Sequence, residues 1–154
     1  MHPVTPTQIT ALLAEAEASP RRRSHLLLHA GHDDQVQRLL IALQPGSYVR
    51  PHQHSQQWEM LVLHRGRLDV LAFTPDGALA ARHRLDRSAP VIQIPLKTWH
   101  AGVALEAGTI VLEVKPGPYR PNEFADWAPE EGTPAATDLV SWLECAAPGT
   151  RWHG

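Results

Sequence analysis

The sequence has few of the residues that cross-link a chain or anchor it in a membrane. Cys145 is the only cysteine among 154 residues, so an intrachain disulfide is impossible and a thiolate metal cluster is excluded. No stretch approaches the roughly 20 apolar residues that cross a bilayer. The N-terminus also lacks the charged start and apolar stretch of a signal peptide. These absences predict a soluble, cytoplasmic protein without membrane contacts.

An excess of charge of either sign is also missing. Lysine and arginine number 14 against 16 aspartates and glutamates, for a formal net charge of -2. The basic residues form no broad stripe of the kind that follows a phosphate backbone, so nucleic acid is not an expected partner. A chain of this length that is 43% hydrophobic suits a single domain over residues 1–154.

Turn-forming residues are frequent and divide the middle of the chain into short apolar runs. Fourteen prolines and ten glycines occur in the sequence, and the runs between them are too short for helices. This pattern predicts an all-β fold, a sandwich or barrel. The expected strands are 25–30, 36–44, 57–64, 67–73, 78–85, 91–94, 100–105 and 109–115.

Helical periodicity occurs only near the two ends. Apolar residues recur at helical spacing over residues 7–18, behind Thr7 as a possible N-cap, and again over 135–146. The second helix places Cys145 among apolar neighbours, where a buried thiol is expected. The predicted organisation is an N-terminal helix at about 7–18, a β-barrel at about 25–116, and a C-terminal arm and helix at about 117–147.

The stretch GSYVRPHQHSQQWEMLVLHRG, residues 46–66, combines histidines with a carboxylate in an apolar run. His52 and His54 project to the same side of an extended backbone. Glu59 shares its parity with inward-facing leucines, and a buried carboxylate is costly unless it is paired or binds a metal. His100, in PLKTWH, follows a turn begun by Pro95. His52, His54, Glu59 and His100 therefore form a ligand set suited to one divalent transition metal ion, such as Zn, Fe, Mn, Ni or Co.

The same residues resemble the first cupin motif. Gly46, His52, His54, Glu59 and Gly66 stand at every fixed position of that motif. The second motif is matched in part, because Pro95 and His100 are correctly separated but Lys97 stands at the usual glycine and Ala104 at the usual asparagine. The segments SPRRRSHLLLH, VQRLLIALQPGSYVRPHQH, WEMLVLHRGRL, TWHAGVALE and EVKPGPY further resemble the WbuC family of cupin-fold metalloproteins, over roughly residues 19–120.

This resemblance implies a double-stranded β-helix, a jelly-roll-type barrel with short flanking helices, that carries a metal on His52, His54, Glu59 and His100. The WbuC family is associated with O-antigen and polysaccharide gene clusters. The expected function is therefore that of a metalloenzyme acting on a sugar or nucleotide-linked sugar, such as an isomerase or lyase. Two alternatives stay open: an iron-dependent oxygenase, and a non-catalytic metal-bearing module that binds an anionic carbohydrate.

Further residues are candidates for binding such a substrate, although none is assigned a catalytic role. Arginine recognises phosphate and carboxylate in a planar, bidentate manner, and three arginines stand in SPRRRSH. Two histidines that follow these arginines share a strand face with Leu27, and the remaining candidates share the strand parity of His52 or Glu59. The candidates are Arg21, Arg22, Arg23, His25, His29, Tyr48, Arg50 and Gln57.

Two further expectations concern strand faces. Residues 36–44 carry apolar side chains on both faces, which predicts contact with a second sheet or a partner chain and agrees with a homodimer. Glu113 and Lys115 share one parity near the end of the last strand, and a solvent-exposed ion pair is the simplest interpretation of them.

Overall fold

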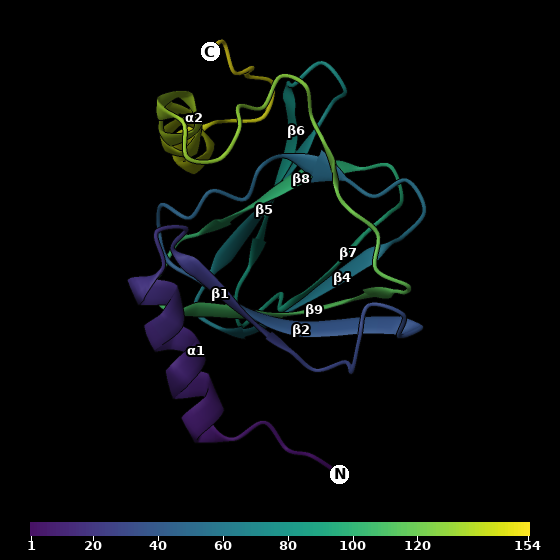
Figure 1. Cartoon of the computed structure of the whole chain (residues 1–154). Coiled ribbons are helices and arrows are strands. Elements are labelled where there is room, and N and C mark those ends of the chain that lie inside the picture. Colours follow the sequence, from purple (N-terminus) through teal and green to yellow (C-terminus); the bar gives the residue numbers. More distant parts are fainter.

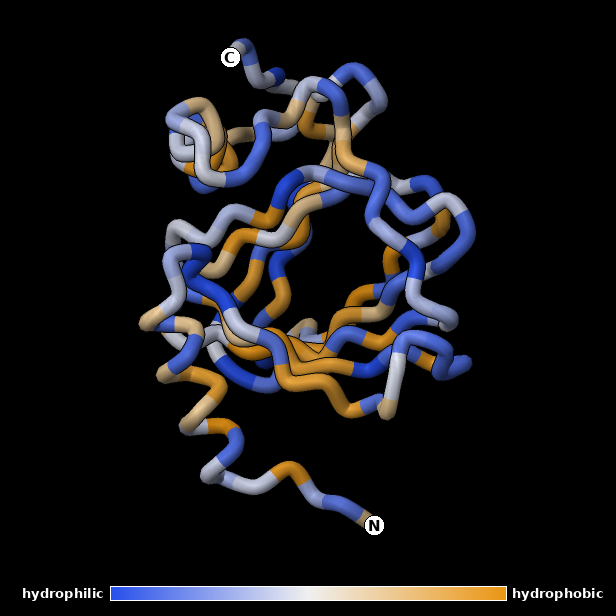
Figure 2. The backbone as a smooth tube through the Cα atoms, in the orientation of Figure 1, coloured by the Kyte–Doolittle hydropathy of each residue, from blue (hydrophilic) through white to orange (hydrophobic).

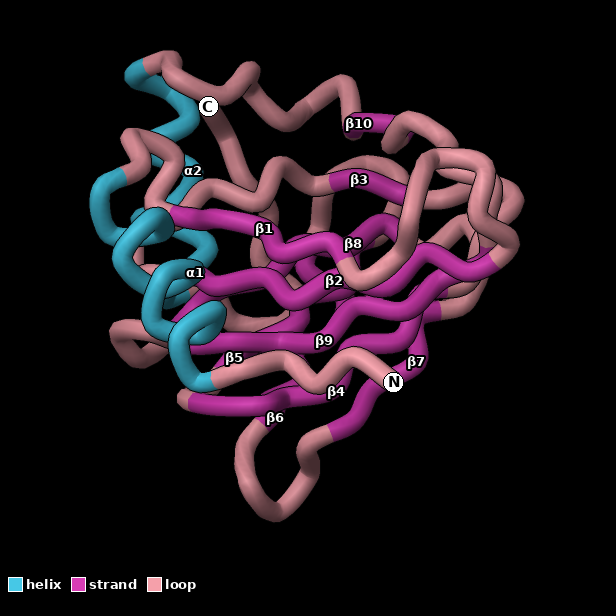
Figure 3. Tube along the Cα trace, turned by 60° about the horizontal axis from the view of Figure 1, so that its bottom comes forward, coloured by secondary structure: helices cyan, strands magenta, loops and turns pink.

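Two antiparallel five-stranded sheets face each other in the computed structural model, which describes residues 1–154. The first sheet has the order β1-β2-β9-β4-β7, and the second has the order β10-β3-β8-β5-β6 (Figures 1 and 3). Most neighbouring strands are distant in the sequence. This topology confirms the predicted all-β, jelly-roll-type class.

The first sheet comprises β1 (Arg23–Leu27), β2 (Val36–Leu43), β9 (Thr109–Pro116), β4 (Glu59–Arg65) and β7 (Val91–Ile94). The second comprises β10 (Glu123–Phe124), β3 (His52–Gln53), β8 (Trp99–Ala104), β5 (Leu68–Phe73) and β6 (Leu79–Leu85). Eight of these strands coincide with the predicted ones within a few residues. The two-residue strands β3 and β10 were not predicted, because two residues are too few to show a periodic pattern.

Helix α1 (Pro6–Ala18) lies against β1 and β2 on the outer face of the first sheet (Figures 1 and 3). Its buried Leu12 and Ala16 pack on Leu40, Ala42 and Ile110 of the sheet. The opposite face of β2 points between the sheets. One apolar face of β2 thus meets the second sheet, as predicted, and the other is covered by a helix of the same chain.

The N-cap of α1 is Thr5, so the expectation of Thr7 was wrong. Thr5 Oγ1 accepts a hydrogen bond from the backbone N–H of Gln8 at 3.3 Å, and Gln8 Oε1 accepts one from the Thr5 N–H at 2.9 Å. This reciprocal capping box satisfies two N–H groups at the helix start. Pro6 follows at the first helical position, where its fixed φ suits the helix.

Helix α2 (Pro134–Cys145) covers the outer face of the second sheet. Its buried residues are Ala136, Leu139 and Leu143, which lie on one side of the helix. Cys145 is exposed, contrary to the expectation of a buried thiol. The reason is geometric, because a residue two positions after Leu143 lies about 200° around the helix from it.

A buried aspartate connects α2 to the second sheet. Asp69 is fully buried on β5 and binds Arg82 at 2.8 Å and Arg84 at 2.9 Å, both on the neighbouring β6. Arg82 also donates to the carbonyls of Leu143 and Ala146 at the C-terminal end of α2. The arginine therefore satisfies helix carbonyls that have no partner within the helix.

Hydrophobic residues are concentrated on the strands, and hydrophilic residues occupy most of the connecting loops (Figure 2). A cluster between the two sheets includes Leu43, Leu61, Leu68 and Val111. The structure contains no helix with the length and hydropathy needed to cross a membrane.

Gly66, at the turn between β4 and β5, has a φ of +80°. A Cβ atom built there would lie 2.8 Å from Thr109 Cα, a backbone atom that cannot move aside easily. The last glycine of the 46–66 motif is therefore required both by backbone conformation and by close packing.

Candidate metal centre

Both sheets contribute to the cluster formed by His52, His54, Glu59 and His100. His52 on β3 and His100 on β8 are direct register partners in the second sheet, with ring centroids 4.3 Å apart. Glu59 begins β4 in the first sheet, and His54 follows β3 in the loop between the sheets. The strand pairing therefore brings His100 beside residues that are 41 to 48 positions away in the sequence.

The turn before His100 supports this arrangement. Lys97 stands where the cupin pattern has glycine, and its φ of 57° lies in the left-handed region that favours glycine. Its backbone N–H donates to the carbonyl of His54 at 2.8 Å. The turn thus keeps its left-handed shape despite the lysine, and it ties the loop of His54 to the strand of His100.

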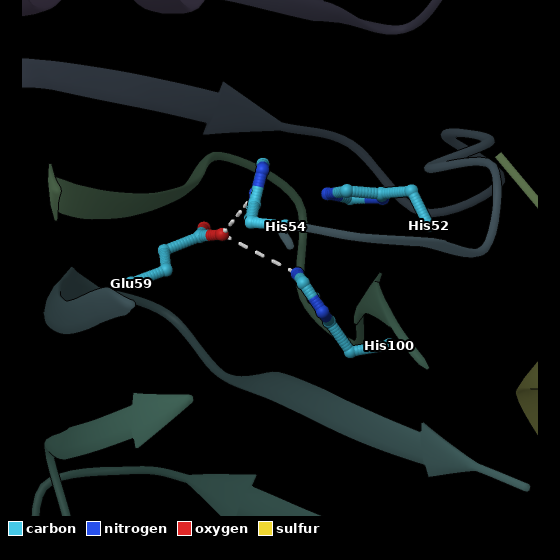
Figure 4. Close-up of side chains that lie close together, drawn as sticks. All are labelled: His52, His54, Glu59 and His100. Carbon is cyan, nitrogen blue, oxygen red and sulfur yellow. Dashed lines mark hydrogen bonds and ion pairs between the residues drawn. The ribbon is translucent and has the colours of Figure 1, made fainter. Parts of the chain in front are cut away.

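The four ligand atoms all lie within 4.8 Å of one another. Glu59 Oε2 is 3.0 Å from His54 Nε2 and 3.3 Å from His100 Nε2 (Figure 4). All four residues are buried, with exposed fractions between 4% and 7%. Such convergence of three imidazoles on one buried carboxylate has the chemistry of a metal site.

Backbone carbonyls determine which nitrogen of two imidazoles faces the centre. His52 Nδ1 lies 2.8 Å from the carbonyl of Arg50, and His100 Nδ1 lies 2.8 Å from the carbonyl of Thr98. A carbonyl only accepts, so each Nδ1 carries the proton, and Nε2 of a neutral ring keeps a lone pair for a ligand. His100 Nε2 is buried and has no polar partner other than Glu59 Oε2 at 3.3 Å. These residues therefore fit a divalent transition metal and could hold one.

The electrostatics of the cluster favour positive charge beside Glu59. Burial opposes ionisation of this carboxylate, but the neighbouring His100 and His54 outweigh burial and hold the pKa of Glu59 well below its usual range. Burial lowers the pKa of His100, yet Glu59 raises it above its ordinary value. Burial and the adjacent His100 lower the pKa of His52 to about 3. His52 is consequently a neutral ligand near neutral pH.

A cavity of about 610 Å³ lies beside the cluster, between the sheets. This volume is in the range of small-molecule sites. One part of its wall is apolar, with side chains such as Leu39, Ile41 and Val70, and another part carries His52, Glu59 and His100. The charged side chains on the wall are Arg21, Arg23, Arg50, Lys115, Glu59, Glu113 and Glu131. Four cations against three carboxylates make the lining net positive, although the whole chain is negative.

Glu113 and Lys115 lie inside this cavity, and the interpretation of an exposed ion pair was wrong. Each is only 8% exposed, and Lys115 Nζ lies 2.7 Å from Glu113 Oε1. Burial and the nearby Glu59 carboxylate raise the pKa of Glu113 to about 7. The sequence signal was the shared parity with Val111, an apolar residue of the same strand that faces inward.

Four of the predicted substrate-binding residues line the cavity. Arg21 and Arg23 both bind the carboxylate of Glu131, with nitrogen–oxygen distances of 2.9 Å and 2.6 Å. Arg50 donates to the carbonyl of Ala128 and lies over the ring of Phe124, 4.8 Å from its centroid. His25 also lines the cavity and is exposed. No sequence pattern indicated Glu131, which is more than 100 residues away from these arginines.

The other four predicted residues lie elsewhere. Arg22 has a φ of 54° and donates to the carbonyl of Pro45, away from the cavity. His29 follows the end of β1, where its Nδ1 lies 2.8 Å from the backbone carbonyl and 3.0 Å from the backbone nitrogen of Arg38. Tyr48 is packed in the core beneath α2, and its hydroxyl donates to the carbonyl of Pro129 at 2.8 Å. Burial raises the pKa of Tyr48 to about 12.

Gln57 borders a second, smaller pocket of about 210 Å³ that also contacts His54. Its side-chain amide donates to the carbonyls of Pro116 and Pro118. The Oε1 atom of Gln57 is buried without a partner.

The fold is of the cupin type, and the ligand cluster within it is a candidate metal centre. A family model described as "Domain of unknown function (DUF6016)" matches residues 4–85, just over half of the sequence. The chain belongs to this family. Membership of the WbuC family stays a prediction, and no curated protein matches the chain.

Solved structures share the fold at low sequence identity. L-ribose isomerase from Geodermatophilus obscurus is 14% identical with a TM-score of 0.56, covering 69% of this chain and 70% of that one. KdgF from Halomonas sp. is 20% identical with a TM-score of 0.53, covering 67% and 85%. Oxalate oxidase in complex with glycolate is 17% identical with a TM-score of 0.54, covering 70% and 57%. At these identities the likeness shows the cupin fold alone.

Proposed function

We propose that this protein is a metal-dependent enzyme that converts a small anionic carbohydrate, a sugar or a nucleotide-linked sugar, by isomerisation or elimination. The observation that carries the proposal is the position of the four-ligand cluster, which opens into a cavity with a net positive lining. A divalent ion held by His52, His54, Glu59 and His100 would polarise a carbonyl or hydroxyl oxygen of the substrate.

The protein itself supplies orientation and a candidate for proton transfer. The carbonyls of Arg50 and Thr98 hold the rings of His52 and His100 with Nε2 toward the centre. His25 lines the cavity, where partial burial together with Arg23 and Arg21 lowers its pKa. A neutral imidazole can accept a proton from a substrate carbon or hydroxyl, which isomerisation and elimination both require.

Three observations support the substrate class. Among the structural neighbours, one protein is an isomerase of L-ribose and another is an oxidase of oxalate, a small oxygen-rich acid. The resemblance to WbuC proteins supports a place in O-antigen or other polysaccharide biosynthesis. The positive lining of the cavity supports an anionic substrate over a neutral one.

Metal analysis of protein purified without an affinity tag is the first test, because a polyhistidine tag would bind metal itself. We expect about one divalent metal ion per chain in the wild type and a large loss in Glu59→Gln. His83→Gln, which removes an exposed histidine on β6, is the matched control and should keep the metal.

Turnover is then measured on the metal-loaded protein with pentoses, hexoses, sugar acids and nucleotide-linked sugars. Conversion that Glu59→Gln abolishes supports the proposal. Oxygen consumption by the iron-loaded protein would instead indicate an oxygenase. Ligand affinity without conversion at saturating metal would indicate a binding module. A protein that holds no metal at this cluster would refute the proposal altogether.

A further inference from the structure

Lys115 is a buried cation inside the cavity. It lies on β9 with Glu113, and both side chains point between the sheets toward the wall that carries Glu59. The exposed fraction of Lys115 is 8%, and its only ion-pair partner is Glu113, at 2.7 Å. A long, flexible side chain held in this position loses conformational freedom and hydration. Glu113 therefore compensates only part of the cost of burying this ammonium group.

The other three cations of the cavity already have protein partners. Arg23 makes two hydrogen bonds to the Glu131 carboxylate and a third to the carbonyl of Tyr48, and its side chain is 11% exposed. Arg21 binds the same carboxylate. Arg50 is engaged with the arm that carries β10, through the carbonyl of Ala128 and the ring of Phe124. Glu131 offsets part of the charge of Arg21 and Arg23, whereas Arg50 uses only its Nε donor on a protein acceptor.

Lys115 differs in combining burial with remaining hydrogen-bonding capacity. An ammonium group has three N–H donors, and one of them faces Glu113 Oε1. The protein provides no acceptor for the other two. Burial lowers the pKa of Lys115, but Glu113 and Glu59 outweigh burial and raise it above its ordinary value, so the side chain is charged at neutral pH.

We propose that Lys115 is the anion-binding residue of the cavity, donating to an anionic oxygen of a carboxylate or phosphate on the ligand. This assignment rests on the proposed function, because it describes the substrate of the same cavity. It places specificity for charge in the interior, next to the metal ligands, rather than at the arginines of SPRRRSH. Those arginines then serve to hold the arm through Glu131.

The test compares simple anions with a neutral counterpart on the full-length protein, both chelator-treated and zinc-loaded. The probes are glycolate, its uncharged analogue glycolamide, and inorganic phosphate, and binding is followed by chemical-shift titration. We expect at least one anion to bind wild-type protein about tenfold more tightly than glycolamide. Whichever of glycolate and phosphate binds more tightly identifies the carboxylate or the phosphate as the preferred group.

Lys115→Met should abolish the preference for the anion, and Lys115→Arg should retain part of it. The matched control is Lys97→Met, which removes the only other lysine, an exposed one. Because Lys115→Met leaves Glu113 without its partner, the double variant with Glu113→Gln is measured as well. If the preference survives in both of these variants, or if Arg23→Met abolishes it while Lys115→Met does not, the assignment is wrong. Failure of the wild type to prefer either anion would also overturn it.

These outcomes are separable from those of the proposed function. A preference that depends on Lys115 in chelator-treated protein stands even if no metal-dependent turnover is found. Conversely, if the protein shows turnover but its preference for the anion over glycolamide is unchanged in Lys115→Met, only the assignment of Lys115 is overturned.

Discussion

Zinc should stabilise the wild-type protein far more than a variant that lacks one ligand of the cluster. The informative change is His100→Ala, because His100 Nε2 is buried and lies among the other three ligand atoms. The variant also opens a small void, so its stability without metal will differ from that of the wild type. The quantity to compare is therefore the gain that zinc produces within each protein.

The size of that gain follows from the linkage between binding and folding. At a zinc concentration about 100 times the dissociation constant, a ligand that binds only the folded state stabilises it by about 2.7 kcal/mol. Loss of an outer partner of a metal ligand costs up to about 100-fold in affinity, so loss of one of the four direct ligands should cost at least about as much. The same zinc concentration then stabilises the variant by only about 0.4 kcal/mol.

The predicted difference of about 2.3 kcal/mol corresponds to about 5–9 °C in Tm for a domain of this size. Thermal unfolding of both proteins, with and without zinc, measures it directly. His83→Ala is the control, since His83 is exposed on β6 and distant in sequence from every ligand. An equal zinc-induced shift in wild type and His100→Ala would refute the reasoning, as would a lost shift in His83→Ala.

Other predictions concern stability. Asp69→Asn should lower the free energy of unfolding by about 2 kcal/mol in urea titrations at pH 7, whereas Asp126→Asn, at an exposed site, should change it little. Burial opposes ionisation of Asp69, but Arg84 and Arg82 outweigh burial and lower its pKa below its ordinary value of 3.8. The contribution of Asp69 to the free energy of unfolding is therefore fully present above pH 3.8. It is lost as the pH falls through the lower pKa of the folded state. Wild-type stability should accordingly drop more steeply in acid than that of Asp69→Asn, and parallel curves would contradict this. Gly66→Ala should cost about 3 kcal/mol or more, because left-handed strain and overlap with Thr109 combine. Gly46→Ala should cost only about 1 kcal/mol, because a Cβ there makes only ordinary contacts with Arg22 and the cost is conformational. Similar losses of stability in the two variants would exclude this account. Lys97→Gly should be neutral or stabilising by up to about 1 kcal/mol. The variant relieves the left-handed strain, but glycine loses more backbone entropy on folding. A clear loss of stability would argue against strain at this turn.

Local spacing was sufficient to single out His52, His54 and Glu59 as candidate ligands and to predict most of the strands. His52 and His54 project to the same side because side chains alternate along an extended backbone, whatever the rest of the chain does. Glu59 was identified by its position in an apolar run, and the structure does place it on an inward face. The bounds of α1 and α2 followed closely from apolar periodicity, whereas the cap at Thr5 depended on side-chain geometry that periodicity does not report.

The partners of the charged residues could not be predicted in the same way. Arg23 binds Glu131 across 108 positions, and the face on which Glu113 and Lys115 point depended on which side of β9 meets the second sheet. An exposed ion pair is the usual arrangement for two opposite charges at a strand end. That prediction assumed that the face of β9 carrying Glu113 and Lys115 is in contact with solvent, whereas it faces the cavity. A one-residue change of strand register would have exchanged the two faces.

Sequence alone thus determined the all-β class, the ligand types and their spacing, because these depend on contacts between residues close along the chain. Tertiary structure decided that the ligands meet at one point, that a cavity adjoins them, and that a lysine lies buried in its wall. Those features arise from pairing between distant strands, and the free energy of that pairing comes from the packing of whole sheets and helices rather than from any single segment.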